Sequence, residues 1–271
     1  MPHQRVNGVE LYWELHGPED GEPLVLNNGV FMTTTSWAFQ LPDLGHRYRV
    51  LTYDMRGQGR SEHPEGEYSL DLHADDLVSL MDGLSWRRAH MVGTSYGGEL
   101  NLVMGERFPQ RCQTLVVIAS VSHSEPPLAA AIGRWHAAAS EGDAARFLRA
   151  IAPDVYSPAF LAEHPEWLAQ VVERAAAFDV RAAARLIESF QRFDRRAALP
   201  VIRVPTCIVS AEWDALKPRA YGEFLHAAIA GSEFHLVPGA GHAVVFERPG
   251  EVNSIVLGFL ARHPIGRRAQ T

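Results

Sequence analysis

The segment around Ser95 has the residue types and the spacing of a catalytic nucleophile. Ser95 stands in the segment GTSYG (93–97), after the apolar run 89–93 and before a helical pattern at 96–108. A strand that turns sharply into a helix at a serine exposes the hydroxyl group at the carboxyl edge of a sheet. Glycines two residues before and after the serine avoid collisions across this turn. The pattern therefore predicts a nucleophile elbow with Ser95 at its corner.

A serine hydroxyl is a weak nucleophile until a base removes its proton, and His242 is the histidine best placed to be that base. It stands in a glycine-containing loop directly after the apolar run 233–237, and loops at strand ends display catalytic groups. The base needs a carboxylate that fixes its tautomer. Asp214, shortly after the run 205–211, is the favoured candidate, and Glu212 and Glu125 are its rivals.

The segments that must position these side chains alternate between strand-like and helix-like patterns. Strand-like runs occur at 9–16, 23–27, 49–53, 89–93, 114–119, 205–211 and 233–237. Helical patterns occur at 69–84, 96–108, 219–230 and 249–262. Continuous apolar strands are typical of a parallel sheet that is covered on both faces. The alternation predicts an α/β fold with a doubly wound, mostly parallel sheet.

Residues 125–199 interrupt this alternation. Strand-like runs disappear, alanine becomes frequent, aromatic residues are interspersed, and Pro153, Pro158 and Pro165 divide the segment into short helical stretches. We expect 125–199 to form an inserted helical cap over a core made by 1–124 and 200–271. The alternative interpretation is that these are longer crossover helices that connect strands of the sheet.

Composition and charge argue against several classes of function. The 271 residues carry a formal net charge of −7, whereas a nucleic-acid-binding surface needs a basic excess. We expect no nucleic-acid partner and no membrane span, because the sequence has no apolar run of about 18 residues. It also has no metal-binding motif and no dinucleotide-binding glycine pattern, so we expect no metal and no cofactor.

Cys112 and Cys207 lie in or beside apolar runs, which predicts buried, inert thiols. The amino-terminal residues lack the apolar region of a signal peptide, and we expect a cytoplasmic location. Formation of a homodimer stays open.

Together these motifs resemble the α/β-hydrolase superfamily over nearly the whole chain. Residues 54–61 (DMRGQGRS) are similar to the family's loop after its fourth strand, and 241–249 to its catalytic-histidine loop. The chain order Ser95, Asp214, His242 is the order of the triad in that family. The resemblance implies a serine hydrolase with a helical cap.

One segment departs from the family pattern. The family usually has His-Gly after its third strand, and this chain has NNGVF (27–31), with Asn28 in place of the histidine. The resemblance implies that the oxyanion hole is made by the backbone N–H groups of Val30 and Tyr96, which a changed side chain need not abolish. This segment and the following 32–35 also resemble, more weakly, enol-lactonases and the acyltransferase that makes hydroxyacyl-hydroxyacid lipids.

We therefore predict hydrolysis of a carboxylic ester or lactone through an acyl-enzyme on Ser95. Acyl transfer to a hydroxyacid or thiol is one alternative, and a small-molecule receptor without turnover is another. The aromatic-rich insertion predicts a mostly apolar substrate pocket. The residues expected to line it are Asn28, Phe31, His123, Trp135, Tyr156 and Phe190.

Overall fold

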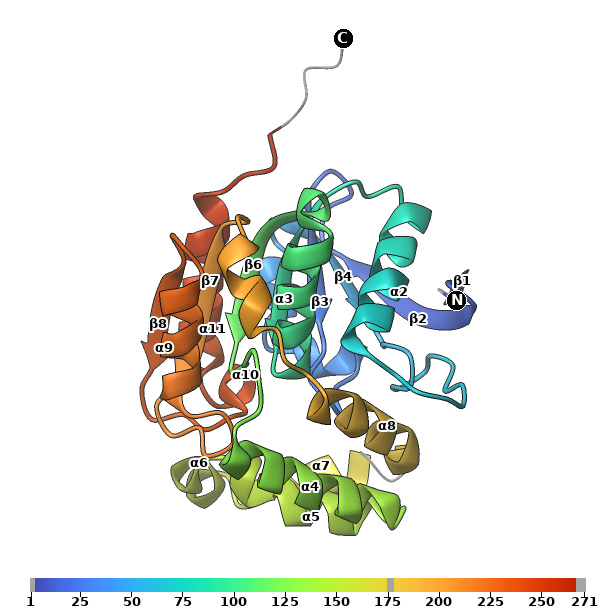
Figure 1. The fold of residues 1–271 in the computed structure, drawn as a ribbon, viewed down its shortest axis with the longest axis vertical. Helices are drawn as coiled ribbons and strands as arrows, with labels where there is room; N and C mark the ends of the chain where they lie inside the picture. The colour runs from blue at the N-terminus through green and yellow to red at the C-terminus, as the bar shows by residue number, and fades with distance from the viewer. Residues whose placement is uncertain (1–2, 175–177, 267–271) are drawn as a thin grey trace.

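An eight-stranded sheet forms the centre of the computed structural model, which describes residues 3–174 and 178–266 (Figure 1). The strands lie in the order β1-β2-β4-β3-β5-β6-β7-β8. Strand β2 is antiparallel to β1 and to β4, and the other neighbouring strands are parallel. Their bounds are β1 (His3–Val6), β2 (Val9–His16), β3 (Glu22–Asn27), β4 (Tyr48–Tyr53), β5 (Ala89–Thr94), β6 (Cys112–Ile118), β7 (Thr206–Ala211) and β8 (Glu233–Val237). The predicted α/β class with a mostly parallel sheet is confirmed.

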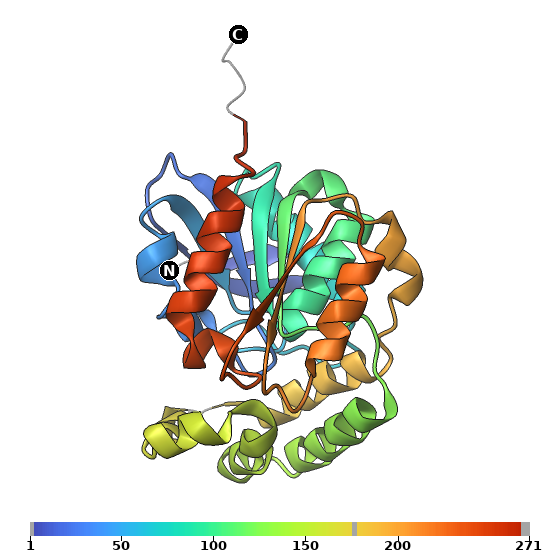
Figure 2. The same cartoon turned by 90° about the vertical axis from the view of Figure 1, so that its left-hand side faces the viewer.

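Helices cover both faces of the sheet and one of its ends (Figures 1 and 2). Those packed on the two faces are α1 (Leu41–Leu44), α2 (Leu70–Gly83), α3 (Tyr96–Arg107), α9 (Arg219–Ala228) and α11 (Pro249–Ala261), and the short α10 (Val244–Glu247) precedes α11. Those at the end of the sheet are α4 (Pro126–Ser140), α5 (Ala144–Val155), α6 (Pro158–Glu163), α7 (Trp167–Arg174) and α8 (Val180–Gln191).

Side chains that alternate along the strands build a separate apolar core on each face. In β3, Val25 joins the core that α2, α3 and α9 cover, whereas Leu24 and Leu26 join the core beneath α1 and α11. All three side chains are fully buried. A strand buried on both sides must be apolar at every position, which explains the continuous apolar runs in the sequence.

The predicted segments agree with the structure to within two residues at each end for β2 to β8, α2, α3, α9 and α11. The sequence did not reveal β1, α1 and α10, each of which is four residues long. Four residues complete about one helical turn or two alternations of a strand, which is too short for a periodic pattern.

Helices α4 to α8 lie together beyond one end of the sheet (Figure 2). In this group α4 packs against α5 and α8. This arrangement favours an inserted cap over crossover helices, although the boundaries at 125 and 199 stay a prediction. Residues 175–177 of the predicted cap and 267–271 of the predicted core lie outside the described residues. None of the helices in residues 3–174 and 178–266 combines the length and the apolar character of a membrane-spanning segment.

Burial of His73 predicts a pH-dependent stability. Burial, with a smaller contribution from the nearby Arg56 charge, lowers the pKa of His73 to about 3. Between pH 6.5 and about 3 the unfolded chain binds a proton here that the folded protein does not, so the free energy of unfolding falls as the pH falls, by about 1.4 kcal/mol per pH unit from this group. We therefore expect the free energy of unfolding of His73→Gln, measured with urea at a series of pH values, to fall less steeply with falling pH than that of wild type. Equal slopes would contradict the assignment of a neutral buried imidazole.

Candidate active site

Ser95 occupies a strained turn between β5 and α3. Its backbone has φ 54° and ψ −120°, a positive-φ conformation that residues other than glycine rarely adopt. A Cβ atom on Gly93 would lie 2.1 Å from the carbonyl oxygen of Gly97, and one on Gly97 would lie 2.0 Å from that of Asn27. Both positions therefore exclude any residue but glycine, and the tight turn holds the Ser95 hydroxyl out toward a cavity.

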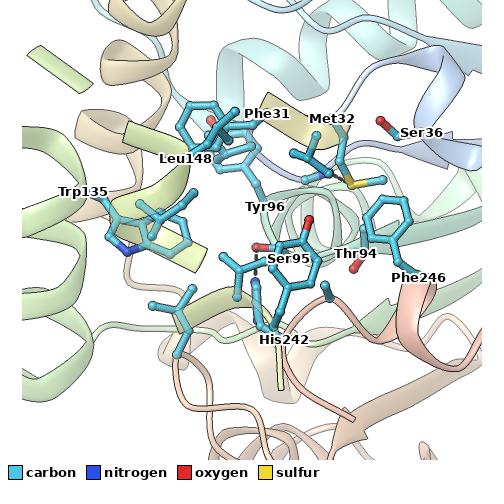
Figure 3. A pocket seen from close by; sticks show the side chains of 18 of the residues that line it. Phe31, Met32, Ser36, Thr94, Ser95, Tyr96, Trp135, Leu148, His242 and Phe246 are labelled. Atoms are coloured by element: carbon cyan, nitrogen blue, oxygen red, sulfur yellow. Dashed lines mark hydrogen bonds between the residues drawn. The ribbon is translucent and has the colours of Figure 1, made fainter. Parts of the chain in front are cut away.

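The structure brings His242 and Asp214 to this hydroxyl group. Ser95 Oγ lies 3.0 Å from His242 Nε2, and His242 Nδ1 lies 2.8 Å from Asp214 Oδ2. The carboxylate of Asp214 can only accept, so Nδ1 carries the proton and Nε2 is free to accept one from Ser95. Figure 3 shows Ser95 and His242 pointing toward one another beside the cavity. This is the geometry in which a histidine can remove a serine proton.

Backbone donors fix the carboxylate of Asp214. Its Oδ1 atom accepts hydrogen bonds from the backbone N–H groups of Leu216 at 3.0 Å and of Lys217 at 2.7 Å. The other oxygen, Oδ2, is then the one directed at His242. Asp214 is only 5% exposed, so little water competes for these hydrogen bonds. Such a buried, fully bonded carboxylate holds the imidazole in one orientation.

The two rival carboxylates are engaged elsewhere. Glu212 accepts the backbone N–H of Gly239 at 2.8 Å and so ties together the loops that follow β7 and β8. Glu125 lies 3.7 Å from His123. In residues 3–174 and 178–266, Asp214 is the carboxylate that hydrogen-bonds to His242.

The two residues expected to donate to an oxyanion lie in different segments, Val30 in the loop after β3 and Tyr96 at the start of α3. Val30 and Tyr96 both line the cavity at Ser95, and neither backbone N–H donates to a protein acceptor among the described residues. Phe31, the next residue in the loop, has φ 70°. Unpaired N–H groups at the cavity that holds Ser95 are what a developing oxyanion requires.

Asn28 is hydrogen-bonded inside the protein instead of lining the cavity. Its Oδ1 atom accepts from Trp37 Nε1 at 2.7 Å, and its Nδ2 donates to the carbonyl oxygen of Tyr53 at 2.9 Å. The residues that line the cavity do not include Asn28, so the expectation that it touches the pocket is wrong. Both ends of its amide are used inside the protein. Its bonds explain how the loop is held without the family's usual histidine.

The segment 54–61 braces the same loop from the other side. The buried carboxylate of Asp54 accepts from the backbone N–H of Thr34 at 2.7 Å and of Arg60 at 2.8 Å. Gln58 donates to the carbonyl oxygen of Gly29 at 2.9 Å. Burial raises the pKa of Asp54, and these N–H donors oppose that rise. The motif therefore acts by fixing the loop that carries Val30.

The cavity at Ser95 has a volume of about 310 Å³ and is mostly apolar. Phe31, Trp135, Tyr156 and Phe190 line it as expected. Figure 3 shows Trp135 and Phe246 on opposite sides of Ser95. Further apolar lining residues that the sequence did not single out come from α5, α7 and the segment before α8: Phe147, Leu148, Ile151, Trp167 and Phe178. The enclosure fits an apolar acyl or ring group.

His123 does not line this cavity, which corrects the sequence-based expectation. It lines a second cavity of about 270 Å³ with Glu125. There its ring packs against Tyr221 and Phe224, with centroid distances of 5.6 and 5.1 Å. Leu216 lines both cavities and lies between them.

Sequence reasoning missed a buried ion pair at the nucleophile. Lys217 Nζ lies 3.1 Å from Ser95 Oγ and 2.7 Å from Glu99 Oε1. Burial raises the pKa of Glu99, while the Lys217 ammonium and the N–H of Val121 oppose that rise. A signal was present: Lys217 is the only lysine among the 25 lysines and arginines of the chain.

One group of potential metal ligands lies within the described residues, on β7 and β8. Cys207, Glu233 and His235 offer ligand atoms within 4.8 Å of one another. Arg262 already binds the Glu233 carboxylate at 2.8 and 2.7 Å, and burial raises the pKa of Cys207 to about 12. A neutral thiol and an occupied carboxylate make poor metal ligands, so we assign no ion here.

Comparison with known proteins relates most of the chain to one family. A family model for the alpha/beta hydrolase fold matches residues 22–249. A putative carbamate hydrolase (RutD) of Variovorax paradoxus is 32% identical over 260 residues, which cover 94% of this chain and 97% of that protein. The crystal structure of an enol-lactonase from Burkholderia xenovorans superposes with a TM-score of 0.90 at 27% identity, covering 96% of this chain and all of the other. The crystal structure of an alpha/beta hydrolase (MGS-M2) from a deep-sea metagenome superposes with a TM-score of 0.91 at 26% identity over both complete chains.

Proposed function

Because the chain belongs to the alpha/beta hydrolase family, we propose that it is a serine hydrolase that cleaves a carboxylic ester or lactone through an acyl-enzyme on Ser95. The observation that carries the proposal is the continuous path of hydrogen bonds from Ser95 Oγ through His242 to Asp214 at the wall of an apolar cavity. The likeness to an enol-lactonase supports a lactone among the substrates.

In the proposed reaction, Ser95 Oγ attacks the substrate carbonyl while His242 Nε2 takes its proton. The backbone N–H groups of Val30 and Tyr96 stabilise the oxyanion. His242 then protonates the leaving oxygen, which gives the acyl-enzyme. Water attacks this ester with His242 as base again, and the acid product leaves.

The lining of the cavity supports substrates with an apolar acyl group. Phe31, Trp135, Tyr156 and Phe190 can cover such a group, and each buried methylene contributes about 0.8 kcal/mol. We therefore expect kcat/KM on p-nitrophenyl esters to rise from the acetate by about fourfold per added methylene until the cavity is full. A flat series, or one with its optimum at acetate, would contradict an acyl site in this cavity.

Burst kinetics on the same esters, with and without a hydroxyacid acceptor, test the reaction type. We expect a burst of p-nitrophenol equal to the enzyme concentration, followed by steady release without an acceptor. Turnover only in the presence of the acceptor would replace hydrolysis with acyl transfer. Ligand binding without a burst, on esters and on lactones, would favour the receptor.

A further inference from the structure

The single lysine of the chain is buried against the nucleophile. The side chain of Lys217 is 2% exposed and that of Glu99 is fully buried. The ammonium group also lies 4.8 Å from the centre of the Phe190 ring, in a cavity otherwise lined mainly by apolar groups. Every other basic side chain of the sequence, apart from the histidines, is an arginine.

Burial of such a pair is costly, because both charges lose their hydration. A protein with an apolar pair of similar volume in its place is often equally stable. Stability alone therefore does not account for this pair. Its position favours a role in the reaction, since both ends of Lys217 are joined to the triad. The backbone N–H donates to Asp214 Oδ1 at 2.7 Å, and Nζ lies 3.1 Å from Ser95 Oγ.

The directions of these hydrogen bonds constrain the serine proton. An ammonium group can only donate, so Ser95 Oγ accepts from Lys217. The one proton of the hydroxyl group must then be donated elsewhere, and His242 Nε2 at 3.0 Å is the acceptor. Lys217 thus selects the serine rotamer that is ready for proton transfer.

We propose that Lys217 is a fourth catalytic residue, whose ammonium group orients Ser95 Oγ and stabilises the negative charge that develops on it, with Glu99 as the positioning residue. The inference rests on the proposed function, because it concerns the same nucleophile. Lys217 adds a fixed positive charge at the reacting oxygen, Ser95 Oγ. The N–H donors of Val30 and Tyr96 act separately, on the carbonyl oxygen of the substrate.

The role applies to both halves of the reaction. During acylation the Oγ–H bond breaks toward His242 while the Oγ–C bond forms, and Lys217 stabilises the charge on Oγ between the two events. During deacylation the Oγ–C bond breaks, Oγ takes the electron pair, and His242 returns the proton. Lys217 keeps its own proton throughout, and Glu99 keeps the buried ammonium group balanced.

Reaction with a fluorophosphonate measures the nucleophile alone, because Ser95 Oγ displaces fluoride from phosphorus and no hydrolysis is required. We expect Lys217→Met to react with it about 100-fold more slowly than wild type, the size of effect seen when one preorganised donor is removed. Since this variant leaves the buried Glu99 charge without its counter-charge, the decisive protein is the double variant Lys217→Met with Glu99→Gln. It lacks both charges and keeps an amide oxygen that can accept the backbone N–H of Val121. We expect it to fold with a Tm close to that of wild type and to remain about as slow as the single variant. A double variant that reacts at the wild-type rate would overturn the proposal and leave the pair a structural one.

Chemical rescue provides a second readout that a structural role would not move. With Lys217→Ala, ethylammonium or propylammonium should restore part of the reaction rate in a saturable manner, whereas propanol of similar size should not. Equal effects of the amine and the alcohol would contradict a role for the positive charge.

The proposed function is tested separately by ester hydrolysis with wild type. A wild-type protein that reacts with the fluorophosphonate at Ser95 and hydrolyses no ester or lactone would contradict the proposed hydrolase. The ratio of its fluorophosphonate reaction rate to that of the Lys217 variants would still test the role of Lys217. A wild-type protein that does not react at Ser95 would contradict both.

Discussion

Replacement of Ser95 with alanine is expected to lower kcat by about 10⁶-fold, since nucleophile and base act as one unit and the loss of either removes the covalent route. Oγ is the only atom deleted, and the backbone at this turn stays as strained with alanine as with serine. Lys217 keeps its partner Glu99 at 2.7 Å. The Tm should therefore stay within a few degrees of wild type, while ester turnover disappears.

Ser36→Ala is the matched control, because Ser36 also places a hydroxyl group at this cavity (Figure 3). Its hydroxyl group accepts the backbone N–H of Thr33 at 3.0 Å and does not contact the triad. We expect this variant to retain activity within tenfold of wild type. Normal turnover by a folded Ser95→Ala protein would remove Ser95 from the mechanism.

Asp214→Asn is expected to lower kcat by about 10⁴-fold, the size typical of a triad aspartate. The reason lies in the two N–H groups, of Leu216 and Lys217, that point at Oδ1. They will hold the amide oxygen of the asparagine in that place and turn its NH₂ group toward His242 Nδ1. His242 Nδ1 can accept this hydrogen bond only if the imidazole proton moves to Nε2. Nε2 can then no longer accept the proton of Ser95.

Glu212→Gln is the control for this change, because it also converts a carboxylate to an amide in the loop after β7. The glutamine oxygen can still accept from Gly239, so we expect activity within a fewfold of wild type. Steady-state kinetics of the two variants side by side check the assignment. If Glu212→Gln, or Glu125→Gln, is the damaging change instead, Asp214 is not the acid.

The sequence predicted the elements of the site that depend on local pattern. The turn at Ser95 has a signature of its own, because both glycines are needed to avoid backbone collisions at 2.1 and 2.0 Å. The positions of Asp214 and His242 follow from the rule that loops after parallel strands meet at one edge of the sheet. Continuous apolar strands likewise made the sheet predictable.

The parts that the sequence did not predict depend on which way side chains turn in the folded chain. Asn28 stands in the right loop, and yet its amide is directed into the protein by Trp37 and Tyr53. His123 follows a central strand, but it lies beyond Leu216 in the second cavity. The pairing of Lys217 with Glu99 joins residues 118 positions apart, and no local pattern indicates such a contact.

The most direct test of the central claim is mass spectrometry of the wild-type protein quenched during turnover of a p-nitrophenyl ester. The account predicts that the acyl group is attached to the peptide that contains Ser95, and that the adduct is absent from Ser95→Ala. Hydrolysis of the ester without an acyl group on Ser95, or with the group on another residue, would contradict it.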